Sequence, residues 1–241
     1  LRPAFKETTQ VIGELKMADM QTSATMQLMQ QQMMLTGDQT TKSLFTPEEY
    51  AMINKFVQEN MMFNLDQMPK LKPAFITNNI VILLYIKNVK GYNPQEQLDM
   101  FFQTQATANG KTIEALETME FQVDLLFNSA TPERQAEVLV CTLSDVDKTL
   151  KNTQDLADAY MAQDLKKMHD IAYKTEGTEC DALPSEMETL VDNRNLQWME
   201  KLPTMMKEQS TFVAVGALHL IGEKGLISLF KKAGYTLEPV K

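Results

Sequence analysis

The segment TFVAVGALHLIGEKGLISLFKKAGYTLEPV, residues 211–240, decides the fold that the sequence predicts. It opens with a nearly continuous apolar run, which is typical of a strand covered on both faces of a sheet. A glycine-containing loop follows, and apolar residues at helical spacing predict a helix over about 223–233. Gly234 fits the C-terminal cap of that helix, and 235–240 is expected to form the next strand. The segment therefore predicts a strand–helix–strand unit of an α/β sheet.

His219, one of only two histidines, lies within this segment, three residues after Gly216. Open α/β sheets bind ligands at the carboxyl ends of their strands, and His219 follows such an end. Gly216 allows the backbone to approach a ligand closely. A single histidine there is more often a packed or capping residue than a ligand, so the residues alone leave both interpretations open. The other, His169, lies among charged helix residues, and we expect it to be solvated.

Strand signals elsewhere are few and short. The expected strands are rich in β-branched residues and lie at 9–16, 111–117, 211–217 and 235–240. The sequence between them reads as helix, with long helical insertions at about 42–105 and 131–208. We find no internal repeat and no linker-like stretch. The prediction is an α/β fold, close to α+β in character, with a small central sheet in a single domain over 1–241.

Helix starts are well marked. Thr46-Pro47-Glu48-Glu49, the segment 93–96 and Thr131-Pro132-Glu133 each combine a capping side chain, a proline at the first helical position and an acidic residue in the first turn. A glutamine-rich segment that carries six methionines is expected to form one helix over about 17–34. The longest apolar run, 80–85, is far shorter than the roughly 18 residues that a membrane span needs. We interpret it as part of a buried helix.

Composition excludes one class of function and leaves the redox state open. The 241 residues are 44% hydrophobic, which suffices for a core, and the net charge is −9. No basic patch is visible, so nucleic-acid binding is not expected. Cys141 and Cys180 show no metal-binding spacing and are either two buried thiols or one disulfide. A disulfide between them would require an oxidising compartment.

Charged residues at apolar positions are the candidate site. Arg194 and Asn195 lie in the middle of an apolar stripe of the helix predicted over 186–203, in which Leu190, Arg194 and Trp198 recur four residues apart. A buried arginine needs an anionic partner, which belongs either to the protein or to a ligand. Glu14 and Glu117 each follow β-branched residues at the end of a predicted strand. Two carboxylates, an arginine and His219 facing one core are compatible with a metal site or an acid–base site.

These residues together resemble the TraB/PrgY/gumN family over essentially the whole chain. The 212–240 segment resembles the family's C-terminal signature, an apolar strand, Gly-x-x-His, a glycine loop, a helix and Gly-Tyr-x-Leu. Five further segments resemble family motifs in the family's order: QVIGELKMADM (10–20), LFTPEEY (44–50), LKPAF (71–75), EQLDMFFQTQATANGKTIEALET (96–118) and LVDNRNLQWMEKL (190–202). The resemblance implies a fold like that of the ChaN-like and erythromycin-esterase-like proteins.

The resemblance also implies a function and roles for residues. Some members, the Tiki proteins, are metal-dependent peptidases acting outside the cell. By this resemblance, His219, Glu14 and Glu117 would bind a divalent metal (zinc, manganese or cobalt), and the two glutamates would also serve catalysis. Arg194 would bind substrate or stabilise an oxyanion, and Asn195 and Asp99 would join it in substrate binding. The expected substrate is a peptide or small molecule.

The sequence departs from the family pattern at its start. A first Gly-x-x-His motif is expected upstream of LRPAF (1–5) and is not in the sequence, and neither is a secretion signal. We expect an extracytoplasmic location, periplasmic, secreted or lipid-anchored, with Cys141 and Cys180 bonded to each other. The main hypothesis is a metal-dependent hydrolase. The alternative is a non-catalytic protein that sequesters a peptide, haem or envelope component in a groove beneath the methionine-rich helix. The oligomeric state is left open.

Overall fold

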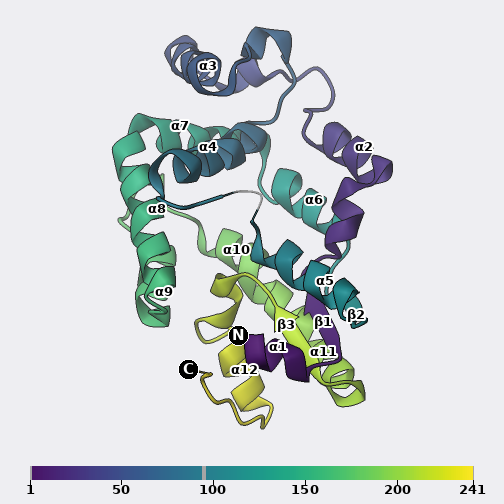
Figure 1. Cartoon of the computed structure of the whole chain (residues 1–241). Coiled ribbons are helices and arrows are strands. Elements are labelled where there is room, and N and C mark those ends of the chain that lie inside the picture. Colours follow the sequence, from purple (N-terminus) through teal and green to yellow (C-terminus); the bar gives the residue numbers. More distant parts are fainter. Residues whose placement is uncertain (1, 94–95, 241) are drawn as a thin grey trace.

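The computed structural model describes residues 2–93 and 96–240 and has a small parallel sheet near one end of the molecule (Figure 1). The central strand is β1 (Gln10–Gly13), which pairs in parallel with β2 (Thr112–Ala115) on one side and with β3 (Thr211–Ala214) on the other. Ile12 of β1 faces Glu114 and Val213 across the two ladders. The α/β fold with a small central sheet is confirmed.

Helices make up most of the remaining chain and fill the two long insertions between the strands. They are α1 (Arg2–Glu7), η1 (Met17–Gln21), α2 (Ser23–Gln32), η2 (Thr41–Leu44), α3 (Pro47–Met61), η3 (Leu65–Gln67), α4 (Pro73–Asn88), α5 (Leu98–Ala108), α6 (Met119–Asn128), α7 (Pro132–Ser144), α8 (Val146–Met161), α9 (Leu165–Ala172), α10 (Pro184–Met187), η4 (Glu188–Asp192), α11 (Asn193–Glu208), η5 (Ala217–Leu220) and α12 (Leu226–Lys232). Whether the whole chain is one domain stays a prediction.

The sheet is covered on both faces, as the apolar sequence of its strands predicts. Side chains of β1 alternate between the two faces, so Val11 and Ile12 enter different clusters. Val11 packs with α1 and α5, which contribute Phe5 and Phe102. Ile12 packs with α11 and α12, which contribute Trp198 and Leu202, and Leu226 and Phe230. The strand ends that carry the candidate site therefore project from a layered and well-packed core.

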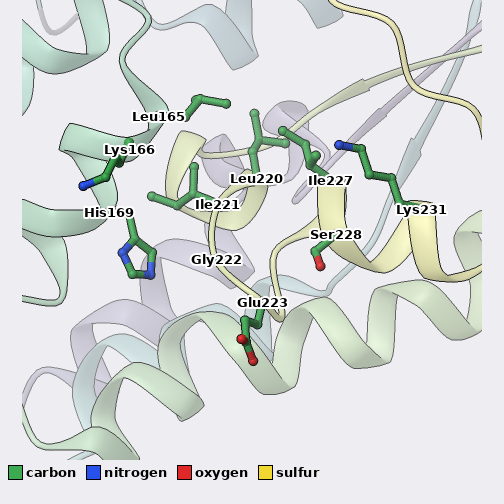
Figure 2. A pocket seen from close by; sticks show the side chains of 10 residues that line it. All are labelled: Leu165, Lys166, His169, Leu220, Ile221, Gly222, Glu223, Ile227, Ser228 and Lys231. Atoms are coloured by element: carbon green, nitrogen blue, oxygen red, sulfur yellow. The ribbon is translucent and has the colours of Figure 1, made fainter.

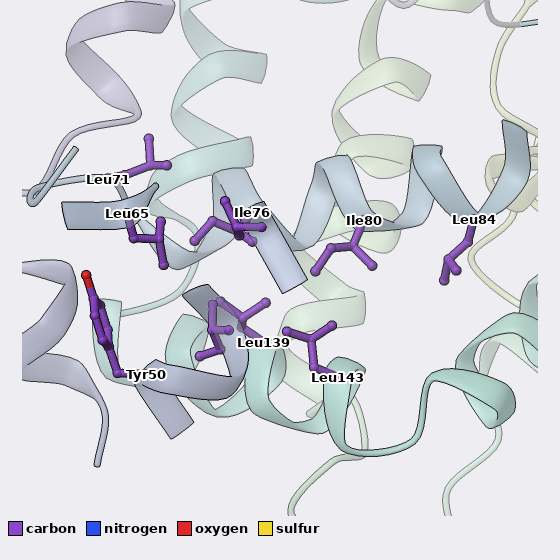
Figure 3. Close-up of a cluster of buried hydrophobic side chains, with 10 residues drawn as sticks. Tyr50, Leu65, Leu71, Ile76, Ile80, Leu84, Leu139 and Leu143 are labelled. Atoms are coloured by element: carbon purple, nitrogen blue, oxygen red, sulfur yellow. The ribbon is translucent and has the colours of Figure 1, made fainter. Parts of the chain in front are cut away.

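A second apolar core lies in the helical part of the molecule. Figure 3 shows Ile76, Ile80 and Leu84 on the side of α4 that faces Leu139 and Leu143 of α7. The same cluster contains Tyr50, Ile53, Val57, Leu65 and Leu71. Because this core shares none of its fully buried members with the clusters around the sheet, the helical part has its own source of hydrophobic stabilisation.

The predicted helix starts are largely confirmed. Thr46 Oγ1 accepts a hydrogen bond from the backbone N–H of Glu49, and the Glu49 carboxylate accepts one from the backbone N–H of Thr46, so α3 begins with a complete capping box. Thr131 caps α7 in the same position before a proline. The start predicted at 93–96 falls partly on residues 94–95, which lie outside the described residues.

Three expectations about elements were wrong. The methionine-rich segment is not one helix, because Thr22 has extended backbone angles and caps α2, which separates it from η1. Residues 235–240 form no strand, because Tyr235 folds back on Phe230 with ring centroids 5.2 Å apart and leaves the rest of the segment exposed. The run 80–85 is buried on one side of its helix only, and Val81 and Ile82 are exposed on the other.

A disulfide joins Cys141 of α7 to Cys180 in the loop before α10. It resolves the two alternatives that the sequence left open in favour of one bond. Next to it, Arg134 of α7 donates to both carboxylate oxygens of Glu186 and to the carbonyl of Asp181, which anchors the same loop by charge and hydrogen bonds. In the described part of the chain, no helix is long and apolar enough to cross a membrane.

We expect the disulfide to form in protein prepared from an oxidising compartment and to stabilise it. Replacing Cys141 with Ala opens a loop with a sequence separation of 39 residues, and on the chain-entropy model this costs about 3–4 kcal/mol of unfolding free energy. Urea unfolding of the variant, with intact-mass measurement after alkylation without reductant, tests both statements. Two alkylated thiols in the wild-type chain would contradict them.

Candidate functional site

The four residues that the sequence singled out meet at the carboxyl edge of the sheet. Glu14 directly follows β1, Glu117 follows β2, and His219 lies in η5 after β3. The backbone N–H of Glu117 donates to the carbonyl of Glu14 at 2.9 Å, which holds the two carboxylates side by side. Arg194 reaches them from the first turn of α11. Parallel strands bring their carboxyl ends to one edge, and this explains why residues more than two hundred positions apart can meet.

Arg194 is the centre of this cluster. Its Nε donates to Glu117 Oε1 at 2.8 Å, and its Nη2 donates to Glu117 Oε2 at 2.8 Å and to Glu14 Oε2 at 2.7 Å. Its Nη1 donates to the carbonyl of Leu190 at 2.9 Å and contacts Nε2 of His219 at 3.1 Å. A guanidinium has five N–H donors, and all five have an acceptor here. In this structure the anionic partners of Arg194 are therefore Glu14 and Glu117, both of which belong to the chain itself.

Arg194 owes its position to the turn that precedes α11. The segment Glu188–Asp192 is a π-helical turn, which is wider than an α-helical turn and shifts the following side chains around the helix axis. Leu190 is therefore exposed, although the sequence pattern placed it on one apolar row with Arg194 and Trp198. The latter two are buried as expected.

The two glutamates differ in burial. The side chain of Glu117 is 5% exposed, and its oxygens also accept from Trp198 and Gln122, each at 2.8 Å. Burial raises the pKa of Glu117, but hydrogen bonds from Arg194 and Gln122 together with the charge of Arg194 outweigh it, so that the pKa lies below its ordinary value. The side chain of Glu14 is 23% exposed. Glu14 is thus the carboxylate of the pair that solvent or a ligand can reach.

Gly216 supplies the last hydrogen bond to Glu14. Its backbone N–H donates to Glu14 Oε1 at 2.7 Å. A Cβ at this position would lie 3.3 Å from the same oxygen and 3.6 Å from the ring of His219. The glycine before the histidine thus lets the backbone approach the carboxylate closely, which is the role that glycine had suggested in the sequence.

His219 is neutral, and its tautomer is fixed by its neighbours. Because a guanidinium can only donate, Nε2 must accept from Arg194, and Nδ1 then donates to Asn195 Oδ1 at 2.8 Å. Burial lowers the pKa of His219 to about 4; the positive charge of Arg194 adds to this effect and the negative charge of Glu14 opposes it. The ring of Trp198 covers the imidazole at 4.3 Å between centroids.

The other two predicted residues occupy different environments. Asn195 is fully buried and uses its amide group to donate to the carbonyls of His219 and Lys224, so it has no donor left for a substrate. Asp99 is exposed in the first turn of α5. Partial desolvation raises the pKa of Asp99, and so does the negative charge of Glu14, which places Asp99 near the accessible carboxylate.

Sequence reasoning missed two glutamines, one that holds the carboxylates and one that holds the chain after Glu14. Gln122 of α6 donates to both Glu14 and Glu117, at 3.2 and 2.8 Å. Gln103 of α5 donates to the carbonyl of Leu15 at 2.7 Å and fixes the loop after Glu14. A Cβ on Gly13 would lie 2.6 Å from this glutamine amide. Gln122 lies one helical turn after Thr118, which caps α6; this spacing is a signal that could have identified it, whereas Gln103 shows none.

Two hollows lie beside the cluster. A groove of about 670 Å³ runs between α2 and the turn after β2, and it is lined by Glu117, Lys16, Asp19 and Glu120 among others. This groove lies beside the methionine-rich segment, and whether it binds a ligand stays a prediction. A cavity of about 500 Å³ lies between α9 and the chain that follows His219, with Leu220 and Ile221 in its wall (Figure 2). His169 also lines this cavity, half exposed and stacked on Tyr173.

The implied divalent metal does not fit these residues as they are arranged. The N–H groups of Arg194 point at the three atoms that would have to bind the ion, which are His219 Nε2 and one oxygen of each glutamate. A dication there would meet the guanidinium charge at contact distance. Across residues 2–93 and 96–240, no group of three His, Cys, Asp or Glu side chains is placed to hold a metal ion. A metal could enter only if Arg194 moved away.

Comparison with known proteins gives the family. The model of the TraB/PrgY/gumN family matches residues 1–239, which is nearly the whole chain. The chain belongs to this family. No curated protein and no solved structure matches it, so the likeness to ChaN-like and erythromycin-esterase-like folds stays a prediction.

Replacing Arg194 with Leu should destabilise the protein by about 3–5 kcal/mol, because it leaves two carboxylates without their buried cation. The side chain of Arg194 is only 8% exposed, so solvent screens this loss little. Urea unfolding at neutral pH measures it. Lys224→Leu is the control: it removes an ion pair with Asp192 whose lysine is 43% exposed, and it should change stability little. Equal effects of the two substitutions would contradict the central role of Arg194.

Stability should fall as the pH drops from 7 to 5 because of His219. Its pKa is about 4 in the folded protein and near 6.5 in the unfolded chain, so only the unfolded chain takes up a proton in this interval. The linkage relation gives a loss of about 2 kcal/mol, which levels off below the folded pKa. Urea titrations at both pH values should show a smaller loss for His219→Gln. An unchanged loss in His219→Gln would disprove the assignment.

Proposed function

We propose that the protein is a hydrolase of peptide bonds in which Glu14 is the general base. The observation that carries this proposal is the state of Glu14: it lies at the carboxyl end of the central strand and is the more exposed glutamate of the cluster. Hydrogen bonds from Gly216, Arg194 and Gln122 hold the Glu14 carboxylate in one orientation, which a general base needs. Family membership supports the class of reaction.

In this proposal Glu14 takes a proton from a water molecule that attacks the substrate carbonyl, and later gives it to the leaving amine. Arg194 and Glu117 are positioning residues, because their hydrogen-bonding groups are already used within the chain. This differs from the expectation that Arg194 binds the oxyanion. Asp99, close to Glu14 and exposed, is the residue we propose for substrate contact.

We also propose an extracytoplasmic location, since disulfides such as Cys141–Cys180 persist in oxidising compartments. Zinc, manganese or cobalt dependence, which the family resemblance implies, would require Arg194 to leave its three acceptors. We route no step through a metal ion, and the experiment below includes metal as a variable.

A second function is favoured by a different observation. Arg194, Asn195 and His219 form a closed network in which each hydrogen-bonding nitrogen is used within the chain. A peptide could then bind in the groove of about 670 Å³ beneath α2 without being cleaved. In that case the cluster would be the rigid support of a binding surface.

Cleavage of a fluorogenic peptide library distinguishes the two functions. If the protein is a hydrolase, Glu14→Gln should lower turnover by roughly 10²–10⁴-fold. Glu114→Gln is the matched control, since this glutamate on β2 is 41% exposed and pairs with Lys16 rather than with the cluster. The assay is run with a chelator and with each of the three metals. Binding of peptides without turnover under any condition would establish the second function and overturn the first.

A further inference from the structure

Helix α4 is apolar on two opposite sides. Its inner side carries Ile76, Ile80 and Leu84, which pack into the helical core against α7 (Figure 3). A surface helix of a globular protein normally carries one apolar stripe and keeps its opposite side polar. Here the opposite side is apolar as well, which calls for a partner.

The outer side of α4 is a continuous stripe. Residues 81, 82, 85, 86 and 89 follow one another at spacings of one and three, which places them on one face of a helix. Val81, Ile82 and Ile86 are 37%, 45% and 46% exposed. Tyr85 extends the stripe through its ring contact with Tyr92, at 5.2 Å between centroids. No member of the stripe is charged. Clustered exposed aliphatic side chains of this kind mark an interaction surface more often than a solvated one.

The N-terminal half of the same face is hollow. A groove of about 220 Å³ is lined there by Thr77 and Asn78 of α4, by Leu125 and Leu126 of α6 and by Leu190. Asn78 precedes Val81 by three residues and Ile82 by four, so the groove and the stripe lie on one face. The face thus has a concave apolar end and a projecting apolar end, with Tyr85 and Ile86 at the latter.

The two ends of this face also differ in charge. Lys90 is exposed just beyond the projecting end, two residues after α4 ends. Lys87, in the last turn of α4, points to the other side of the helix and donates to Asn60 of α3. Asp124 of α6 lies at the hollow end, where it shares a second small pocket with Leu125 and Ser129. If two copies met with their α4 helices antiparallel, each projecting end would face the hollow end of the other, and Lys90 would face Asp124. A surface that fits itself after a half-turn is what an isologous interface requires.

We propose that this outer face of α4 is the interface of a two-fold homodimer. An antiparallel arrangement buries the aliphatic stripe of both copies and pairs the basic end of each with the acidic end of the other. The uncharged stripe is also a place where two chains of net charge −9 can approach without like charges in contact. The candidate site at the sheet edge is built from other elements, so this proposal does not depend on the proposed function.

The test is the mass of the protein in solution, measured by sedimentation and by light scattering over a concentration series. We expect a dimer for the wild type. Ile86→Glu should weaken its dissociation constant by at least about tenfold, because a carboxylate would be buried in an apolar contact. Met161→Glu is the matched control: Met161 is 78% exposed on another helix, and the change should leave the dimer intact. Circular dichroism should show both variants folded, because neither residue belongs to a buried cluster.

A charge swap tests the antiparallel arrangement. Lys90→Glu alone and Asp124→Lys alone should each weaken the dimer, and the double variant should recover it. A monomeric wild type overturns the proposal, as does a dimer that Ile86→Glu leaves unchanged. Flotation of a monomeric wild type with phospholipid vesicles would assign the stripe to a lipid surface instead and would equally overturn it. If Ile86→Glu is monomeric but the double variant does not regain the dimer, the antiparallel arrangement is overturned.

Discussion

The guanidinium of Arg194 is the constraint on which the candidate site depends. Among the described residues it is the one group that hydrogen-bonds to both glutamates and to the histidine, and each of its donors has an acceptor. Two carboxylates held side by side in a largely buried edge would repel each other strongly if no cation lay between them. Burial lowers the pKa of His219, and the positive charge of Arg194 adds to this effect. The geometry of the cluster therefore depends on one side chain. A metal ion could hold these three side chains together in the same way, and in this structure Arg194 does so.

The support of the cluster comes from elements that have no part in chemistry. Two glutamines, Gln103 and Gln122, hold the chain after β1 and the carboxylates themselves. Gly13 and Gly216 leave the room for these contacts, since a Cβ at either position would lie within 3.3 Å of a polar atom of the site. The sheet brings the two glutamates to one edge, and the glycines and glutamine amides allow close contacts there. Such supporting contacts determine how rigidly a carboxylate is oriented.

Much of this arrangement could be predicted from the sequence, and the part that could not has physical causes. The apolar stripe around Arg194 implied a buried charge, and burial implied carboxylate partners, so the ion pairs followed. Three of the four expected strands were placed correctly but drawn too long, because an apolar residue such as Val215 looks the same in the sequence whether or not a neighbouring strand pairs with it. The methionine-rich segment has helical composition throughout, but the cap at Thr22 divides it into two helices. The exposure of the outer side of α4 could not be foreseen, because an apolar helix reads as buried whatever covers it.

The three strands are distributed along the chain in a way that bears on how the molecule is made. Gln10 pairs with Thr112 on one side and with Thr211 on the other, so closing the sheet joins segments on the order of a hundred residues apart, a type of contact that forms slowly because of the loop entropy. The helical core around α4 and α7 needs no such closure. A chain emerging from a ribosome could therefore pack its helices long before β3 exists. Arg194 and His219 lie later in the sequence than both glutamates, so the cluster can form only after β3 and the segment that follows it have been synthesised. A chain that ended before β3 could carry the helical core but not the complete site.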